Sequence, residues 1–173
     1  DTLHFLDVLT SLSINYNMMS LPDSSLALLV KNTPVINKFR GSIYQKAMLK
    51  ERFGDTYFAL NNYNQALETY KQAYNLFAAD NNHADQGYEA INVGRTYMQL
   101  KNYSSAEQYL RSAYRLNDSL HMISYARDAA QQLSHLYQVT NNWQKAYEWL
   151  ETQIALKDSL QLTEQNEKIA ELQ

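Results

Sequence analysis

The chain has 173 residues, no cysteine and a formal net charge of −3, with 45% hydrophobic and 19% charged residues. This composition excludes disulfides, thiol catalysis and cysteine-ligated zinc, and the absence of a basic run argues against nucleic acid as a partner. No stretch approaches the roughly 18 consecutive apolar residues of a membrane span. Only 4 glycines and 2 prolines occur, and strand-like alternation is missing, so the sequence predicts an all-α fold.

The first 41 residues carry helical patterns that differ from those of the rest of the chain. Apolar residues recur through the first dozen positions and indicate one helix. Residues 21–24 are typical of a second helix start. Thr33 followed by Pro34 resembles a further start, because proline is favoured at the first helical position.

From residue 42 onward, a short segment returns every forty residues. Asn-Asn-Tyr-Asn-Gln-Ala at residues 61–66 comes back in related form at 101–106 and 141–146. A fixed period in this range is the signature of a repeat array. Each unit is predicted to consist of two helices, and those of the middle unit run from about residue 85 to 100 and from about 103 to 117.

Small residues recur in phase with the period. Gly54 and Gly94 occupy the same position within a predicted helix, where glycine costs roughly 1 kcal/mol relative to alanine. We therefore expect a close approach of the partner helix at these glycines. The small residues on the second helix of each unit are Ala66, Ala106 and Ala146, and the tyrosines that keep the same step are Tyr57, Tyr97 and Tyr137. Most tyrosines are accordingly assigned to the core.

After the last repeat, the chain becomes rich in Glu, Gln and Lys. Leu162, Ile169 and Leu172 leave a thin apolar seam, with spacings of 7 and 3 residues. Such a seam is found where a helix enters a coiled coil, which would favour a homodimer. The alternative is a capping helix that packs one strip of side chains on the last repeat.

The repeat resembles the tetratricopeptide repeat (TPR) family. The family's small and large signature positions match Gly54, Tyr57 and Ala66 in the first unit, and the third unit departs with Ser134 in place of glycine. The resemblance implies an all-α, right-handed α-α superhelix, a TPR-like solenoid. It divides the chain into degenerate N-terminal helices (1–41), three TPR-like repeats (42–160) and a C-terminal helix (161–173). The usual TPR period is near 34 residues, so either longer helices or longer inter-repeat turns must account for the extra residues in each repeat of this chain.

The last eighteen residues are similar to the end of TPR sensor regions in bacterial membrane-anchored histidine kinases and LuxR-type regulators. This resemblance implies a protein- or peptide-binding module for signal transduction in the periplasm, joined to a membrane only through residues outside this chain. The alternative is a free-standing cytoplasmic scaffold or assembly adaptor.

The TPR resemblance also implies a set of candidate partner-binding positions, because the outward face of each first helix lines a concave groove in that family. These positions are Met48, Arg52, Asp55, Phe58, Tyr88, Asn92, Arg95, Met98, Gln131, Gln132, His135 and Gln138. Such a mixture of amides and apolar groups suits a peptide held by backbone hydrogen bonds and an apolar anchor. The sequence leaves open whether the groove or the convex face binds.

No catalytic, cofactor or metal site is recognised in the sequence. The four histidines lack metal-ligand spacing, and no nucleophile motif or glycine-rich phosphate loop is present. Asp80, His83 and Asp85 lie in a predicted turn, for which a solvated loop is favoured over a weak metal site. We therefore expect a protein that is not an enzyme and needs no cofactor.

Overall fold

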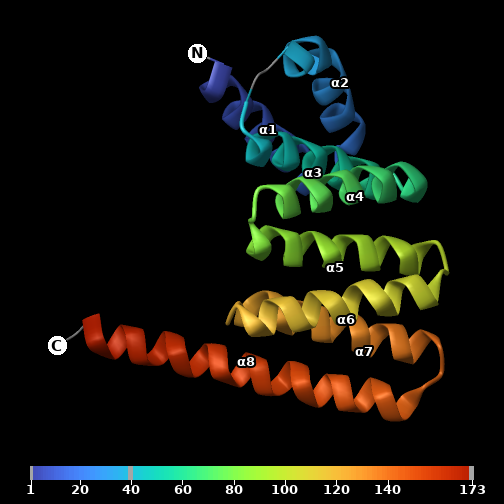
Figure 1. Cartoon of the computed structure of the whole chain (residues 1–173), viewed down its shortest axis with the longest axis vertical. Coiled ribbons are helices and arrows are strands. Elements are labelled where there is room, and N and C mark those ends of the chain that lie inside the picture. The colour runs from blue at the N-terminus through green and yellow to red at the C-terminus, as the bar shows by residue number, and fades with distance from the viewer. Residues whose placement is uncertain (1, 39–40, 172–173) are drawn as a thin grey trace. The chain divides into compact units, whose positions relative to one another are not determined.

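A computed structural model describes residues 2–38 and 41–171, and these residues form helices joined by short turns, with no strand (Figure 1). The eight helices of the described ranges are α1 (Thr2–Met18), α2 (Pro22–Lys38), α3 (Ile43–Ala59), α4 (Tyr63–Ala79), α5 (His83–Gln99), α6 (Tyr103–Ser119), α7 (Ile123–Val139) and α8 (Trp143–Glu171). The predicted all-α fold is confirmed. The two helices predicted for the middle repeat correspond to α5 and α6.

The helices from α3 to α8 are joined by turns of one design. The central residue of each turn has a positive φ of 56° to 58°, at Asn61, Asn81, Lys101, His121 and Asn141. In the first turn, the Asn62 N–H donates to the Tyr57 carbonyl at 2.8 Å and the Asn61 N–H donates to the Phe58 carbonyl at 2.9 Å. This pairing is a Schellman motif, which satisfies the last carbonyls of a helix. Asparagine suits the central position because it adopts the left-handed conformation more readily than most residues.

The last residue of several turns caps the helix that follows. The side chain of Asn102 accepts a hydrogen bond from the Ser105 N–H at 3.2 Å. Asn62 and Asn142 make the equivalent bond to the third residue after them, at 3.5 and 3.3 Å. Asparagine is among the preferred residues for this role, since its side chain satisfies a helix N–H that has no internal partner. The polar pair of the recurring motif thus specifies one helix end and the next helix start.

The forty-residue period has a simple structural origin. Helices α3 to α7 contain 17 residues each, and three residues separate each helix from the next. The turn between repeats, residues 80–82, is as short as the turn within a repeat, residues 60–62. The extra length over the usual TPR period therefore lies in the helices and not in the inter-repeat turns.

The chain forms two compact units, Asp1–Glu89 and Ala90–Gln173, whose boundary falls within α5. The first unit has two apolar clusters. One cluster joins α1, α2 and α3 through Leu6, Leu9, Leu29 and Leu49, with Phe53 packed against it. The other joins α3 and α4 through Ala47, Ala73 and Phe77. The handedness of a superhelix and the division into domains at residues 41 and 160 stay predictions.

The N-terminal helices are also tied to α3 by buried hydroxyl groups. The Oγ atoms of Ser13 and Ser25 lie 2.8 Å apart, and the Ser25 Oγ lies 2.9 Å from the Thr56 Oγ1. All three residues are buried. Because buried hydroxyl groups are costly unless they are hydrogen-bonded, this network fixes how α1 and α2 meet α3.

The second unit is built on α6, α7 and α8. Leu110, Leu133 and Leu136 are almost completely buried. The rings of Tyr114 and Trp149 meet edge to face with centroids 4.9 Å apart, which joins α6 to α8. Such aromatic pairs add to the stabilisation from area burial alone.

Both helical glycines lie where another helix approaches closely. A Cβ atom at Gly54 would lie 2.5 Å from the Tyr70 Cδ1, and one at Gly94 would lie 2.6 Å from the Leu110 Cγ. The expected close approach is confirmed. The approaching group is the large side chain of the second helix. Ala106 contributes only its carbonyl oxygen, 3.5 Å from a Cβ at position 94.

The helix start predicted at Thr33 and Pro34 is wrong. Pro34 lies inside α2, which continues to Lys38. The Thr33 Oγ1 donates to the carbonyl of Leu29 at 3.1 Å, so it bonds back along the same helix instead of capping a new one. Proline is tolerated there because it removes a single backbone bond close to the helix end, and its ring is exposed.

The tail continues α8 without a break to Glu171. Leu162 is 60% exposed. The Ile169 side chain and Leu172 lie outside the described parts of the chain, so the predicted coiled coil and homodimer stay predictions. Within the described ranges, no helix combines the length and the apolar content needed to cross a membrane.

Candidate functional site

The predicted groove positions within residues 1–89 are half-buried, and two of them, Arg52 and Asp55, form an ion pair. Met48, Arg52, Asp55 and Phe58 lie on α3, and Tyr88 lies on α5. The Arg52 guanidinium forms an ion pair with Asp55 at 2.9 Å and a second ion pair with the adjacent Glu51. The Tyr70 hydroxyl donates to Asp55 at 2.9 Å. The charges of Arg52 and Asp55, which are predicted to contact a partner, are therefore largely neutralised by neighbouring side chains.

Glu51, which pairs with Arg52, has a carboxyl group buried within the fold. It is 5% exposed, and its burial raises the pKa of the carboxyl from 4.5 to about 7. The positive charge of Arg52 opposes this rise, whereas the negative charges of Asp55 and Asp85 add to it. The carboxyl thus titrates near neutral pH for reasons internal to the fold.

The raised pKa has a consequence for stability. In the folded protein Glu51 keeps its proton up to about pH 7, whereas in the unfolded chain the proton leaves near 4.5. The stability from protonated Glu51 is thus fully present below pH 4.5 and is lost as the pH rises through 7. We expect the unfolding free energy of the wild type to fall by about 2 kcal/mol between pH 5 and pH 8 through this group.

The Glu51→Gln variant should not show this loss, because glutamine does not titrate. Urea denaturation of both proteins at pH 5 and pH 8 measures the difference. Glu68→Gln is the matched control, since Glu68 is exposed on α4, and it should follow the wild type. Parallel pH dependences of the wild type and Glu51→Gln would refute the assignment.

The predicted groove positions of the second unit divide into buried and exposed residues. Asn92 and Met98 are only 3% and 8% exposed. The exposed side chains are Arg95 on α5 and Gln131, His135 and Gln138 on α7, while Gln132 is half-buried. The three exposed α7 positions share one face because they follow helical spacing. The assignment of all twelve residues to one groove stays a prediction, since the two units are described separately.

A second polar cluster joins α6 and α7. The Tyr137 hydroxyl donates to Glu107 at 2.5 Å, and Arg111 contacts both the Tyr137 oxygen at 2.8 Å and Glu107 at 2.9 Å. Burial raises the pKa of Tyr137, and the hydrogen bond to Glu107 raises it further. Tyr137 is buried, whereas the matching Tyr57 and Tyr97 are half-buried. The assignment of most tyrosines to the core is therefore wrong, since most of them keep part of their surface exposed. These three side chains of the cluster hydrogen-bond to one another, so we interpret the cluster as a structural link between α6 and α7.

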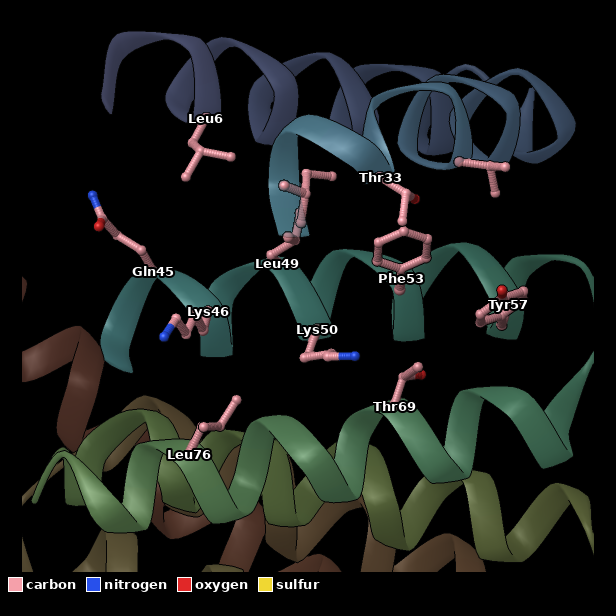
Figure 2. A pocket seen from close by; sticks show the side chains of 12 residues that line it. Leu6, Thr33, Gln45, Lys46, Leu49, Lys50, Phe53, Tyr57, Thr69 and Leu76 are labelled. Carbon is pink, nitrogen blue, oxygen red and sulfur yellow. The ribbon is translucent and has the colours of Figure 1, made fainter. Parts of the chain in front are cut away.

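A cleft of about 530 Å³ opens on the first unit, beside α3 (Figure 2). Half of its lining comes from one face of α3, namely Gln45, Lys46, Leu49, Lys50, Phe53 and Tyr57. The rest consists of Leu6 from α1, of Val30, Thr33 and Ile36 from α2, and of Thr69 and Leu76 from α4. The volume falls in the range typical of ligand sites.

The floor of the cleft is the edge of the first apolar cluster. Leu49 belongs to that cluster, and Ile36 and Phe53 pack against it. In Figure 2, Leu49 and Phe53 rise from α3 toward α2, whereas Lys46 and Lys50 lie on the side of α3 that faces α4. Sequence reasoning missed this site because its walls come from four helices, and two of these helices lie outside the repeat pattern.

No group of three histidine, cysteine, aspartate or glutamate side chains within the described ranges could hold a metal ion. The segment expected to be a solvated loop, Asp80 to Asp85, is instead a turn and the start of α5. Within it, the Asn82 side chain accepts a hydrogen bond from the Asp85 N–H at 3.2 Å and donates one to the Asp85 carboxylate at 2.7 Å.

Residues 45–119 match the family model described as tetratricopeptide repeat. No curated protein sequence matches the chain. The matched segment therefore consists of tetratricopeptide repeats, and the predicted TPR-like fold is confirmed. TPR families are generally protein-binding modules without catalytic activity.

Solved structures support the same fold. Aspartyl phosphate phosphatase F from Bacillus subtilis is 15% identical with a TM-score of 0.84, over 92% of this chain and 42% of that one. The apo form of RapI is 17% identical with a TM-score of 0.82, over 97% and 61%. A Pyrococcus horikoshii signal transduction ATPase with a tetratricopeptide repeat sensor is 15% identical with a TM-score of 0.80, over 95% and 26%. This chain thus spans less than two thirds of each of these three proteins.

Proposed function

We propose that this chain is a non-catalytic module that binds a segment of another protein in the cleft beside α3. The observation that carries the proposal is the cleft itself, which combines an apolar floor with an open rim on a tetratricopeptide repeat scaffold. Repeat scaffolds generally function through such surfaces.

The chemistry of the lining fits recognition better than reaction. The floor offers Leu49, Phe53 and Ile36 to apolar side chains, and a partner that covers the exposed part of these groups removes apolar surface from water, which is favourable. The described lining residues include no histidine, aspartate or glutamate that could act as a general base beside the threonine hydroxyls. The cleft therefore supports binding through side-chain burial with a few polar contacts at the rim.

At a finer level, we propose that the module is the sensor region of a bacterial signal-transduction protein and lies outside the cytoplasm. Support comes from the similarity of residues 156–173 to the ends of such sensor regions and from the fold shared with an ATPase that carries a tetratricopeptide repeat sensor. The reading frame downstream of residue 173 should then encode a membrane span within a few dozen residues. A soluble continuation would favour the scaffold alternative.

Selection from a random peptide library displayed on phage tests the binding function. We expect the immobilised chain to enrich peptides that bind the cleft, and Phe53→Ala should weaken a selected peptide by about tenfold or more, because buried aromatic contacts dominate many interfaces. Affinity is measured by fluorescence anisotropy with the synthetic peptide.

Phe58→Ala is the matched control. Both phenylalanines lie on α3, both are half-buried, and each ring contacts a tyrosine, at 6.2 Å for Phe53 and Tyr57 and at 5.3 Å for Phe58 and Tyr63. Only Phe53 lines the cleft, whereas Phe58 is a predicted groove position. A larger loss in Phe58→Ala than in Phe53→Ala would move the binding site to the groove. Failure to enrich any peptide would contradict the proposed function.

A further inference from the structure

The charges on the cleft wall are all of one sign. Among the described lining residues, the charged side chains are Lys46 and Lys50. This lining also includes the neutral Tyr57 phenol, and it contains no aspartate or glutamate. No ion pair between either lysine and a described residue is found. The cleft is thus a positive site on a chain whose formal net charge is −3.

The two lysines are spaced one helical turn apart on α3, so their side chains start from the same face of the helix. In Figure 2 their ends point in opposite directions along the helix. One turn of an α-helix rises about 5.4 Å. A partner helix with carboxylates three or four residues apart repeats its charges at the same interval. The apolar residues Leu49 and Phe53 lie beside the lysines along the same stretch of α3, so a partner must present apolar and acidic side chains next to each other.

The walls also select the form of the bound segment. Every described lining residue belongs to a regular α-helix, as one example from each of the four helices shows: Leu6, Thr33, Phe53 and Thr69. Within helices the backbone N–H and C=O groups bond to each other, so the cleft offers no strand edge to an extended peptide. The lining instead favours a partner that binds through its side chains, as an amphipathic helix does when it lies in an apolar groove.

We propose that the cleft binds an acidic amphipathic helix of a partner protein. Its apolar face covers Leu49 and Phe53, and its carboxylates, one turn apart, face Lys46 and Lys50. This inference rests on the proposed binding function and adds the chemical class of the partner. Charge complementarity favours an acidic partner, since the two lysines attract carboxylates to the cleft, whereas the net negative charge of the chain repels acidic segments from the rest of its surface.

The test uses the peptides selected on phage with the wild-type chain. The enriched sequences should carry paired acidic residues three or four positions apart beside apolar ones. For a selected peptide, the double variant Lys46→Glu with Lys50→Glu should lose about tenfold or more in affinity, through loss of two exposed ion pairs and gain of repulsion. Replacing the peptide's paired acids by lysine should restore binding to this variant.

The control is the double variant Lys31→Glu with Lys157→Glu, which makes the same change in net charge at two exposed positions outside the cleft lining. Its affinity should stay within about twofold of wild type, since separated surface charges are screened by salt.

Other outcomes separate the two proposals. If the lysine variant binds unchanged while Phe53→Ala does not, the cleft binds peptides but the acidic partner is wrong. If both bind unchanged, the proposed function at this cleft fails with the inference. If vesicles of phosphatidylglycerol, but not of phosphatidylcholine, bind the wild type and displace the peptide from it, and if they do not bind the lysine variant, the cleft takes an anionic lipid and the protein partner is overturned.

Discussion

Phe77→Ala is expected to lower the free energy of unfolding by about 3–5 kcal/mol, the range for truncating a fully buried phenylalanine. Phe77 has an exposed fraction of 0% and packs on Ala47 and Ala73 between α3 and α4. Its ring also meets the Tyr44 ring edge to face, with centroids 5.8 Å apart. The two alanines are too small to fill the space that the ring would leave, so a cavity would remain.

Asn117 provides a matched contrast, because it occupies the same repeat position forty residues later and is also fully buried. No hydrogen-bond partner for either polar atom of its side chain is found among the described residues. We expect Asn117→Leu to stabilise the protein by about 1–3 kcal/mol, the usual cost of a buried unpaired amide. Urea denaturation followed by circular dichroism measures both variants. A loss below about 1 kcal/mol in Phe77→Ala would contradict the packing described for the first unit.

Ala106→Trp is expected to cost about 3 kcal/mol, at the upper end of the range for overpacked cores. Ala106 has an exposed fraction of 0% and lies on α6 beside the point where Leu110 fills the space over Gly94. The contact at Gly94 is already so close that a single added Cβ would lie 2.6 Å from Leu110. An indole at position 106 therefore has no free volume to enter.

Ala155→Trp is the control for this variant. Ala155 lies on α8 in the same unit and is exposed, so the substitution should change the unfolding free energy by no more than about 0.5 kcal/mol. Thermal and urea denaturation measure the pair. Equal stabilities of the two variants would refute the assignment of the recurring alanines to a packed helix interface.

The repeat region was predictable because its determinants are local. The Asn-Asn pair at residues 61 and 62 holds both the left-handed residue and the helix cap, and both interactions stay within five residues along the chain. The recurring glycine and its close neighbour also follow directly from the period, as Gly54 with Tyr70 shows. Patterns of this range are visible in a single sequence.

The N-terminal helices were less predictable. Thr33 and Pro34 form a convincing local helix start, yet α2 continues through them. The packing of α2 on Leu6, Leu49 and Phe53 extends on both sides of the proline, and tertiary contacts of this kind override local preferences.

The candidate sites show the same division. The period predicted which residues lie on the outward face of each first helix, but not that Arg52 would pair with Glu51 and Asp55. The cleft depends on how α2 meets α3, and no spacing within the repeats encodes that contact. Lys46 and Lys50 could therefore not be assigned to a site from the sequence, because two lysines one turn apart are typical of an ordinary solvated helix face.

Photo-crosslinking of a selected peptide shows whether the cleft beside α3 is where the partner binds. The peptide carries a benzophenone group on its apolar face, and the crosslinked residues are identified by mass spectrometry after digestion. We expect crosslinks to the cleft lining of α2, α3 and α4, such as Ile36, Phe53 and Leu76. Crosslinks confined to the exposed face of α7, at Gln131, His135 and Gln138, would contradict this expectation.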